Sequence, residues 1–311
     1  MLSLPLIATL ATAGVCVDRW LGEPGTAHPL VGFGKFAMGI EARLNTGRHG
    51  RLFGILAWAL AVLPPVLIAV WLVTVLPFML TCAVHVLLLW FALGARSLND
   101  HIAPIARALA QHDLAEARRL TARIVSRETA HADESALARA AVESALENGN
   151  DAIFGALFWF AVGGGPGALA FRLANTLDAM WGYRTPRYLR FGWAAARIDD
   201  VLNWIPARLT AASYALLGDT RTAWRCWREQ APRWDSPNAG PVMASGAGSL
   251  NVLLGGAAVY HGTIEARPTL GAGQAAGTAH IGAALRLVER TVILWLALLI
   301  VLALMSVPFH G

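Results

Sequence analysis

Long apolar runs alternate with charged segments along this chain, and the runs are long enough to cross a bilayer. The longest extends from Leu52 to Gly94 without a charged side chain. One crossing takes roughly 20 apolar residues, so this run predicts a helical hairpin with spans at 52–75 and 76–94. Residues 291–307 predict a C-terminal span. Residues 2–17 lack a positively charged leader and a clear cleavage signal, which predicts an uncleaved first span.

The intervening polar segment 95–150 has the periodicity of amphipathic helices. Leu98, Ile102, Ile105 and Leu109 recur at helical spacing, and a second set follows from Leu114. A third helix is predicted at 134–148, and Gly149 is expected to end it. The pattern therefore predicts a helical region beside the membrane.

The cations predict the orientation of the chain. All but one of the 25 Lys and Arg residues are arginine, and none lies before Asp18 or after Arg290. The positive-inside rule places residues 18–51 and 95–150 in the cytoplasm and both chain ends outside. If residues 152–171 and 201–217 both crossed, the Arg-rich stretch 172–200 would lie outside. The Gly-rich break at 163–167 favours a re-entrant or membrane-associated arrangement for both segments.

Composition agrees with a membrane protein. Hydrophobic residues make up 56% of the chain, charged residues only 14%, and mean hydropathy is +0.51. A soluble domain carries about 25% charged residues. The net charge of +5 is explained by arginines near anionic lipid, and no nucleic-acid-binding motif is present. We predict an all-α integral membrane protein: one multi-pass domain, 1–311, with four to five membrane helices, a re-entrant segment, and cytoplasmic segments at 95–150 and 218–290.

Two groups of polar residues stand beside apolar sequence, where ionisable side chains are costly. Glu143 and Glu147 lie one helical turn apart, and Asn148 and Asp151 follow directly before an apolar run. Carboxylates at that boundary need a partner, either an arginine or a divalent cation.

The second group begins with Arg172, Asn175 and Asp178, which share one helical face. It continues through Tyr183, Arg184, Arg187, Arg190, Arg197, Asp199, Asp200 and Asn203. Arginines beside paired carboxylates suit a phosphate with Mg²⁺, since guanidinium groups bind phosphate oxygens and carboxylates hold the metal. An internal lattice of salt bridges explains the same pattern equally well.

A dozen short blocks in collinear order, from about residue 14 to 290, resemble the adenosylcobinamide-phosphate synthases of cobalamin biosynthesis, the CobD/CbiB family. They include G-E-P (22–24), H-P (28–29), A-R-S-L (95–98), V-S-R-E-T (125–129), D-E (133–134), A-A-V-E-S (140–144), E-N-x-x-D (147–151), N-T-L-D-x-M-x-G-Y (175–183), F-G-W-A-x-A-R-x-D-D (191–200), I-P-A-R-L (205–209), S-P-N-A-G (236–240) and R-P-T-L-G-x-G (267–273). The chain departs from the family pattern at Gly149, where many members have Thr or Ser, and at 241–243.

The resemblance implies a ligase in the bacterial inner membrane with its active face in the cytoplasm. Such enzymes join adenosylcobyric acid to (R)-1-amino-2-propanol, or its phosphate, in an amide bond, using ATP and Mg²⁺. Other corrinoid-pathway enzymes are possible partners, and nucleic acid is not one.

The same resemblance suggests roles for the polar residues. The expected catalytic residues are Glu143, Glu147, Asp151, Asp199 and Asp200, and the last four are the expected Mg²⁺ ligands. The expected substrate- and phosphate-binding residues are Arg127, Asn148, Asn175, Asp178, Tyr183, Arg184, Arg187, Arg197 and Asn238. Two other functions compete with the ligase: a membrane transporter, suggested by the broken segment at Gly163–Gly167, and a non-catalytic scaffold for corrinoid enzymes.

Overall fold

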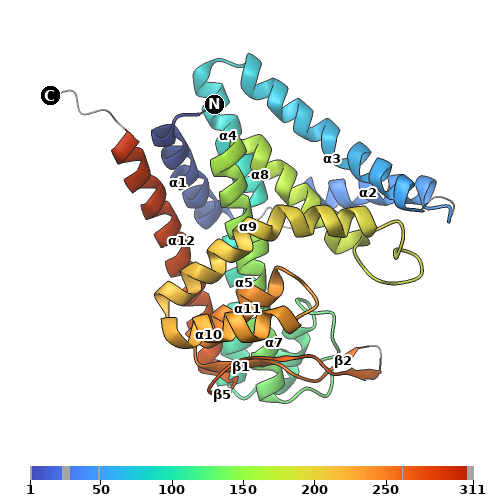
Figure 1. Cartoon of the computed structure of the whole chain (residues 1–311), viewed down its shortest axis with the longest axis vertical. Coiled ribbons are helices and arrows are strands. Elements are labelled where there is room, and N and C mark those ends of the chain that lie inside the picture. Colours follow the sequence, from blue (N-terminus) through green and yellow to red (C-terminus); the bar gives the residue numbers. More distant parts are fainter. Residues whose placement is uncertain (1, 23–28, 48–49, 261, 307–311) are drawn as a thin grey trace. The chain divides into compact units, whose positions relative to one another are not determined.

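The computed structural model describes residues 2–22, 29–47, 50–260 and 262–306. The G-E-P and H-P blocks therefore lie mostly outside the described residues, as does Val307 at the end of the predicted last span. Helices dominate the described chain (Figure 1). This confirms the predicted all-α membrane fold class.

The α-helices cover the apolar runs and the amphipathic segments. They are α1 (Leu4–Leu21), α2 (Pro29–Leu44), α3 (Gly50–Val75), α4 (Phe78–Ala92), α5 (Ala95–Ala110), α6 (Leu114–Thr121), α7 (Glu134–Gly149), α8 (Gly155–Trp181), α9 (Trp193–Leu217), α10 (Thr220–Gln230), α11 (Ala239–Ser249) and α12 (Thr278–Ser306). A π-helical turn (Asn150–Phe154) joins α7 to α8, and a 3₁₀ turn (Ala231–Arg233) follows α10.

Among the described residues, five helical stretches are long and apolar enough to cross a membrane, and two of them combine neighbouring elements. They are Leu4–Leu21, Gly50–Val75, Phe78–Ala110, Glu134–Trp181 and Thr278–Ser306. The break between α3 and α4 falls at Leu76–Pro77, where the hydrophobic pattern predicts a turn. The helix α9 is not in this set, although it covers the predicted membrane-associated segment 201–217.

Short strands, which the sequence pattern did not predict, follow α11. Strand β1 (Val252–Gly255) pairs antiparallel with β4 (Thr269–Gly271) and parallel with β5 (Gln274–Ala275). Strands β2 (Ala258–Tyr260) and β3 (Thr263–Glu265) form a separate hairpin. The three-stranded sheet brings Gly255 into register with Thr269, two residues after Arg267, and so positions two parts of the site described below.

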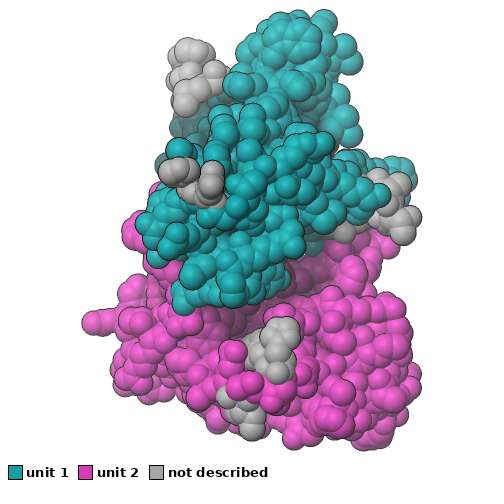
Figure 2. All heavy atoms as spheres, turned by 90° about the vertical axis from the view of Figure 1, so that its right-hand side faces the viewer, with its two compact units in different colours: residues 1–94, 155–203, 298–311 teal, residues 95–154, 204–297 magenta. Residues whose placement is uncertain are grey.

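The chain divides into two compact units, which Figure 2 distinguishes by colour. The first comprises residues 1–94, 155–203 and 298–311, and the second comprises 95–154 and 204–297. The core of the first unit packs α2, α3 and α8 around Ala57, Ala61, Leu177, Trp181 and Phe191. In the second unit, α5 buries Leu98, Ile102, Ile105 and Leu109, so the predicted amphipathic face is confirmed.

Two local predictions need partial correction. The α-helix α7 ends at Gly149, as predicted, but the chain continues through the π-helical turn into α8 and does not leave the helix axis in an open turn. The predicted break at 163–167 is a kink inside α8. Within α8 the backbone departs from helical geometry at Gly164, with φ 62° and ψ −154°. Only glycine readily adopts this conformation. The N–H group of the next residue, Gly165, donates to Nδ1 of His85 at 2.8 Å, which satisfies a donor that the kink releases.

Candidate functional site

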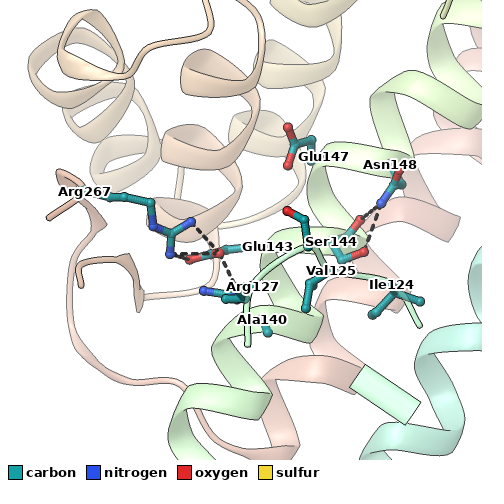
Figure 3. A pocket seen from close by; sticks show the side chains of 10 residues that line it. Ile124, Val125, Arg127, Ala140, Glu143, Ser144, Glu147, Asn148 and Arg267 are labelled. Atoms are coloured by element: carbon teal, nitrogen blue, oxygen red, sulfur yellow. Dashed lines mark hydrogen bonds and ion pairs between the residues drawn. The ribbon is translucent and has the colours of Figure 1, made fainter. Parts of the chain in front are cut away.

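A cavity of about 170 Å³ in the second unit gathers polar residues from three segments that are far apart in sequence (Figure 3). Helix α7 and the loop that precedes it form most of the lining, and Arg267 completes it. The lining residues are Ile124, Val125, Ser126, Arg127, Ala140, Glu143, Ser144, Glu147, Asn148 and Arg267. Arg127, Glu143, Glu147 and Asn148 were among the residues predicted from the sequence.

Glu143 is the centre of a buried ion cluster. Nη2 of Arg127 lies 2.8 Å from Oε2 of Glu143, and both terminal nitrogens of Arg267 lie 3.3 Å from its carboxylate. The backbone N–H of Gly255 also donates to Oε1 at 2.7 Å. Two guanidinium groups therefore share one carboxylate. The cluster of Arg127, Arg267 and Glu143 carries one positive charge, and an ionised Glu147 in the same cavity offsets it. The guanidinium donors themselves suit phosphate or carboxylate oxygens.

Glu147 lies one turn further along α7 and differs sharply from Glu143. Within the described chain, Glu147 makes no hydrogen bond or ion pair, and no dashed line reaches it in Figure 3. Its neighbour Asn148 donates from Nδ2 to the carbonyl and the hydroxyl of Ser144. Glu147 therefore presents a carboxylate with free lone pairs to the cavity, whereas Glu143 is occupied by its donors.

Asp151 lies in the π-helical turn, where its Oδ1 accepts from Asn150. The Asn150 Oδ1 in turn accepts from the buried hydroxyl of Thr210 on α9. Single π-helical turns within α-helices are frequent at functional sites. Here the turn separates the polar helix α7 from the apolar helix α8.

Hydrogen bonds from distant segments hold the walls of the cavity. The backbone N–H of Glu128 donates to the carbonyl of Val259 in β2, and the Glu128 side chain accepts from Gly262. The side-chain amide of Gln230 binds both backbone groups of Gly271. The ring of Trp234 lies under the guanidinium of Arg267, 5.5 Å from ring centroid to Cζ. These contacts limit the movement of Arg127 and Arg267.

The first unit contains a second acidic group, centred on Asp199 of α9. Asn175 of α8 and Asn203 of α9 donate to its two carboxylate oxygens, at 3.3 and 3.1 Å. Burial raises the pKa of Asp199 to about 6; the charge of Asp200 adds to this effect and the two amides oppose it. Within the described chain, the Asp178 carboxylate makes no hydrogen bond or ion pair.

Asp200 is more exposed to solvent than Asp199. Arg197 lies 3.3 Å from its Oδ2 and is itself mostly exposed. Burial raises the pKa of Asp200, and the charges of Arg197 and Arg184 lower it. The exposed loop residue Tyr183 precedes Arg184. Arg184 and Arg197 therefore act on Asp200, and a role for these residues in binding substrate stays a prediction.

Arg187 and Asn238 have protein partners that the sequence did not reveal. Arg187 forms a two-pronged pair with buried Glu41 of α2, at 3.0 and 2.7 Å. Hydrogen bonds from Arg187 hold the pKa of Glu41 below its usual range, despite burial. Asn238 accepts from Nη1 of Arg208 at 2.8 Å. Both residues thus have a structural contact in addition to any role in binding substrate.

Comparison with known proteins identifies the family. The model of the CobD/Cbib protein family matches residues 11–288. The chain belongs to this family. A Cobalamin biosynthesis protein CobD from Stutzerimonas stutzeri is 59% identical over 91% of this chain and 94% of its own length. Proteins of the same name from Chromobacterium violaceum and Halalkalibacterium halodurans are 53% and 38% identical, over 95% and 92% of this chain and 96% and 93% of their own lengths. No solved structure matches the chain significantly.

Four of the CobD/Cbib blocks meet at the cavity in the second unit. V-S-R-E-T supplies Ser126 and Arg127, A-A-V-E-S supplies Glu143 and Ser144, E-N-x-x-D supplies Glu147 and Asn148, and R-P-T-L-G supplies Arg267. Sequence reasoning did not predict Arg267 as a site residue, although it opens one of these blocks. Glu41 was also missed, because a single carboxylate in an amphipathic helix gives no signal of its partner.

The departures from the family pattern have local explanations. A Cβ atom at Gly149 would lie 2.6 Å from the hydroxyl of Tyr214, which donates to the carbonyl of Leu146. Glycine therefore leaves room for the tyrosine. Pro241, Val242 and Met243 are all buried in α11, where they contribute to packing.

The predicted Mg²⁺ ligands divide between the two units. Glu147 and Asp151 belong to the second, and Asp199 and Asp200 belong to the first. Among the described residues, no group of three or more His, Cys, Asp or Glu side chains is placed to hold a metal ion. The metal site of four carboxylates stays a prediction.

Proposed function

We propose that this protein is an ATP-dependent amide ligase of cobalamin biosynthesis. It would join adenosylcobyric acid to (R)-1-amino-2-propanol or its phosphate, on the cytoplasmic face of the bacterial inner membrane. Family membership supports the pathway. The observation that carries the proposal is the cavity in the second unit, where two arginines converge with Glu147, a carboxylate that has no partner among the described residues.

The chemistry requires an activated carboxyl group. A carboxylate is a poor acceptor for an amine, and transfer of the terminal phosphoryl group of ATP would convert it to an acyl phosphate. Attack by the amine then forms the amide bond and releases phosphate. Arg127 and Arg267 would bind and orient the phosphate oxygens and stabilise the charge that develops on them. Their contacts with Glu143 and Trp234 fix them in place before substrate arrives.

Glu147 is suited to take the proton that the amine loses. It shares the cavity with the two arginines and has no protein partner among the described residues. A general base must reach the proton it removes, and a carboxylate already saturated with donors, such as Glu143, is a poor base. We therefore assign Glu147 the role of base and Glu143 that of a positioning residue.

Mg²⁺ would enter with ATP. This ion usually keeps several waters and binds one or two carboxylates together with substrate phosphates, so it needs no protein cage. Glu147 is the cavity carboxylate with coordination sites free and would hold the ion if it does not serve as the base. Arg184 and Arg197 would bind anionic oxygens in the first unit, with Asp199 and Asp200 beside them as metal ligands.

Assay of the purified full-length protein in nanodiscs tests this proposal. Adenosylcobyric acid, aminopropanol phosphate, ATP and Mg²⁺ are supplied, and mass spectrometry detects the condensed corrinoid. We expect the wild type to form product only with ATP. The rate of product formation should fall at least about 100-fold in Glu147→Gln, which is the range expected when a general base is removed. Glu229→Gln, a matched change at an exposed site on α10, should retain activity. Equal activity in Glu147→Gln would remove this residue from the mechanism, and no product from the wild type would favour the scaffold.

One observation favours transport as the second candidate. A cavity of about 380 Å³ in the first unit lies beside the kink in α8 and is lined by Thr74, Thr81, His85 and Gly164 among others. Broken helices that line cavities are typical of transporters. Flux of adenosylcobyric acid into proteoliposomes without ATP would support transport, and its absence together with product formation would support the ligase.

A further inference from the structure

The second half of α9 exposes a continuous apolar stripe. Trp204, Ile205, Leu209 and Leu216 are 54%, 47%, 44% and 65% exposed. With 3.6 residues per turn, all four fall within an arc of about 140°. The opposite side of the helix buries Ala207, Thr210, Ala211 and Tyr214 completely. This half of the helix is therefore amphipathic, and its exposed apolar face is directed away from the second unit, to which residues 204–217 belong.

This helix is not built to cross a bilayer. It is 25 residues long but carries Arg197, Asp199, Asp200 and Arg208, and it is absent from the five described helices that are apolar enough to span. A helix with one apolar face and several charges lies in the plane of the membrane surface instead.

A hydrogen bond to α12 places α9 at a defined depth. Nε1 of Trp295 on α12 donates to the hydroxyl of Ser213 on α9 at 2.9 Å. Arg290 is the last charged residue of α12, and its apolar stretch begins at Thr291. Trp295 is four residues further on, which corresponds to about 6 Å along the helix. Interfacial helices bury their apolar faces roughly 5–10 Å into the boundary between headgroups and acyl chains.

An aromatic and cationic pair marks one end of the stripe. The guanidinium of Arg208 lies 4.5 Å from the centroid of the Trp204 ring. Tryptophan is enriched at the level of the lipid headgroups, and arginine keeps its charge there while its stem contacts apolar groups. Arg208 also donates to Asn238 and to the carbonyl of Pro237. The pair thus connects the exposed stripe to the S-P-N-A-G loop.

We propose that Trp204–Leu216 of α9 is an in-plane membrane anchor, with its stripe embedded in the headgroup–acyl boundary of the bilayer. The helix bonded to α9 through Trp295, α12, is apolar enough to span a membrane and exposes apolar side chains such as Ile293, at 59% exposure, so lipid is the occupant. The anchor holds the S-P-N-A-G loop at the membrane surface, where an amphipathic substrate would arrive. This inference is independent of the proposed ligase activity.

Spin-label accessibility in full-length protein in nanodiscs tests the anchor. Cys16, Cys82 and Cys226 are replaced by alanine, and single cysteines are introduced by Leu209→Cys and Leu216→Cys. Ile300→Cys on α12 serves as the lipid-exposed control and Arg225→Cys on α10 as the water-exposed control. Collisions with oxygen, which concentrates in lipid, are compared with collisions with a water-soluble nickel chelate.

We expect oxygen collisions to exceed nickel collisions at positions 209 and 216, as at position 300, with the reverse at position 225. If collisions with the nickel chelate exceed those with oxygen at positions 209 and 216, the stripe lies in water and the proposal is overturned. Low accessibility to both reagents, with dipolar broadening between labels, would place a second copy on the stripe and overturn it as well. Ile205→Cys provides a replacement reporter if either variant does not fold.

Discussion

The guanidinium of Arg267 lies 3.3 Å from the carboxylate of Glu143, although 124 residues separate them in the chain. Arg127 reaches the same carboxylate from the loop before α7. This pairing joins three family blocks at one buried point and forms the wall of the cavity in the second unit. Its energetic importance follows from burial, because the side chains of Glu143 and Arg127 are only 7% and 8% exposed.

Removing the shared carboxylate should destabilise the fold strongly. Glu143→Ala leaves two arginines and the N–H of Gly255 without their acceptor, and breaking a buried ion pair costs about 3–5 kcal/mol. We expect a clearly lower thermal unfolding temperature in detergent. Arg119→Gln, which breaks an exposed pair with Glu116, should produce no measurable change. Similar unfolding of both variants would contradict a structural role for Glu143.

Asp199 should make the stability of the fold fall as pH rises through the weakly acidic range. Its pKa of about 6 lies above the usual value of about 3.9, so the folded state binds this proton more tightly than the unfolded state. Stability is then lost as pH rises between these values, by about 3 kcal/mol at most. Asp199→Asn should therefore melt at a higher temperature than wild type at pH 8, with the difference shrinking towards pH 4. Asp235→Asn, an exposed control, should follow the wild-type curve; a parallel curve for Asp199→Asn would refute the assignment.

The pair formed by Glu41 and Arg187 should act in the opposite direction. The pKa of Glu41 is lowered, so its contribution is present above the usual glutamate value of about 4.3 and is lost as pH falls below it. Arg187→Gln should lower the unfolding temperature at pH 7, and the difference from wild type should shrink as pH falls towards 3 and Glu41 becomes protonated. Arg190→Gln in the same exposed loop is the control. If the unfolding temperature of Arg187→Gln stays equally far below that of wild type at pH 3, the side chain stabilises the fold by packing and not by its charge.

The kink in α8 should depend on one glycine and not on its neighbour. Gly164 has a positive φ, and a Cβ atom there would lie 2.7 Å from Cε1 of His85. Gly164→Ala should cost at least about 1–3 kcal/mol, measured by thermal unfolding in detergent. Gly163→Ala meets nothing within 4 Å and should be neutral or stabilising, since alanine favours helix. Equal tolerance at both positions would show that the kink is not required.

The membrane fold was predictable from local sequence because its signal is local. Apolar runs longer than a bilayer crossing, the turn at Leu76–Pro77 and the periodicity of α5 all follow from neighbouring residues. The carboxylates of the candidate site were predictable for a related reason. Glu143, Glu147 and Asp199 lie beside apolar sequence, where an ionised side chain is costly and is typical of a functional site.

Only the tertiary structure distinguished the roles of these groups. Glu143 and Glu147 look alike in sequence, one turn apart on α7, yet the first accepts from Arg127, Arg267 and Gly255 and the second has no partner among the described residues. Likewise, the pairing of Arg187 with Glu41 spans 146 residues. Spacing along a chain fixes which residues share a helical face, but which distant segment packs on that face depends on packing of the whole unit.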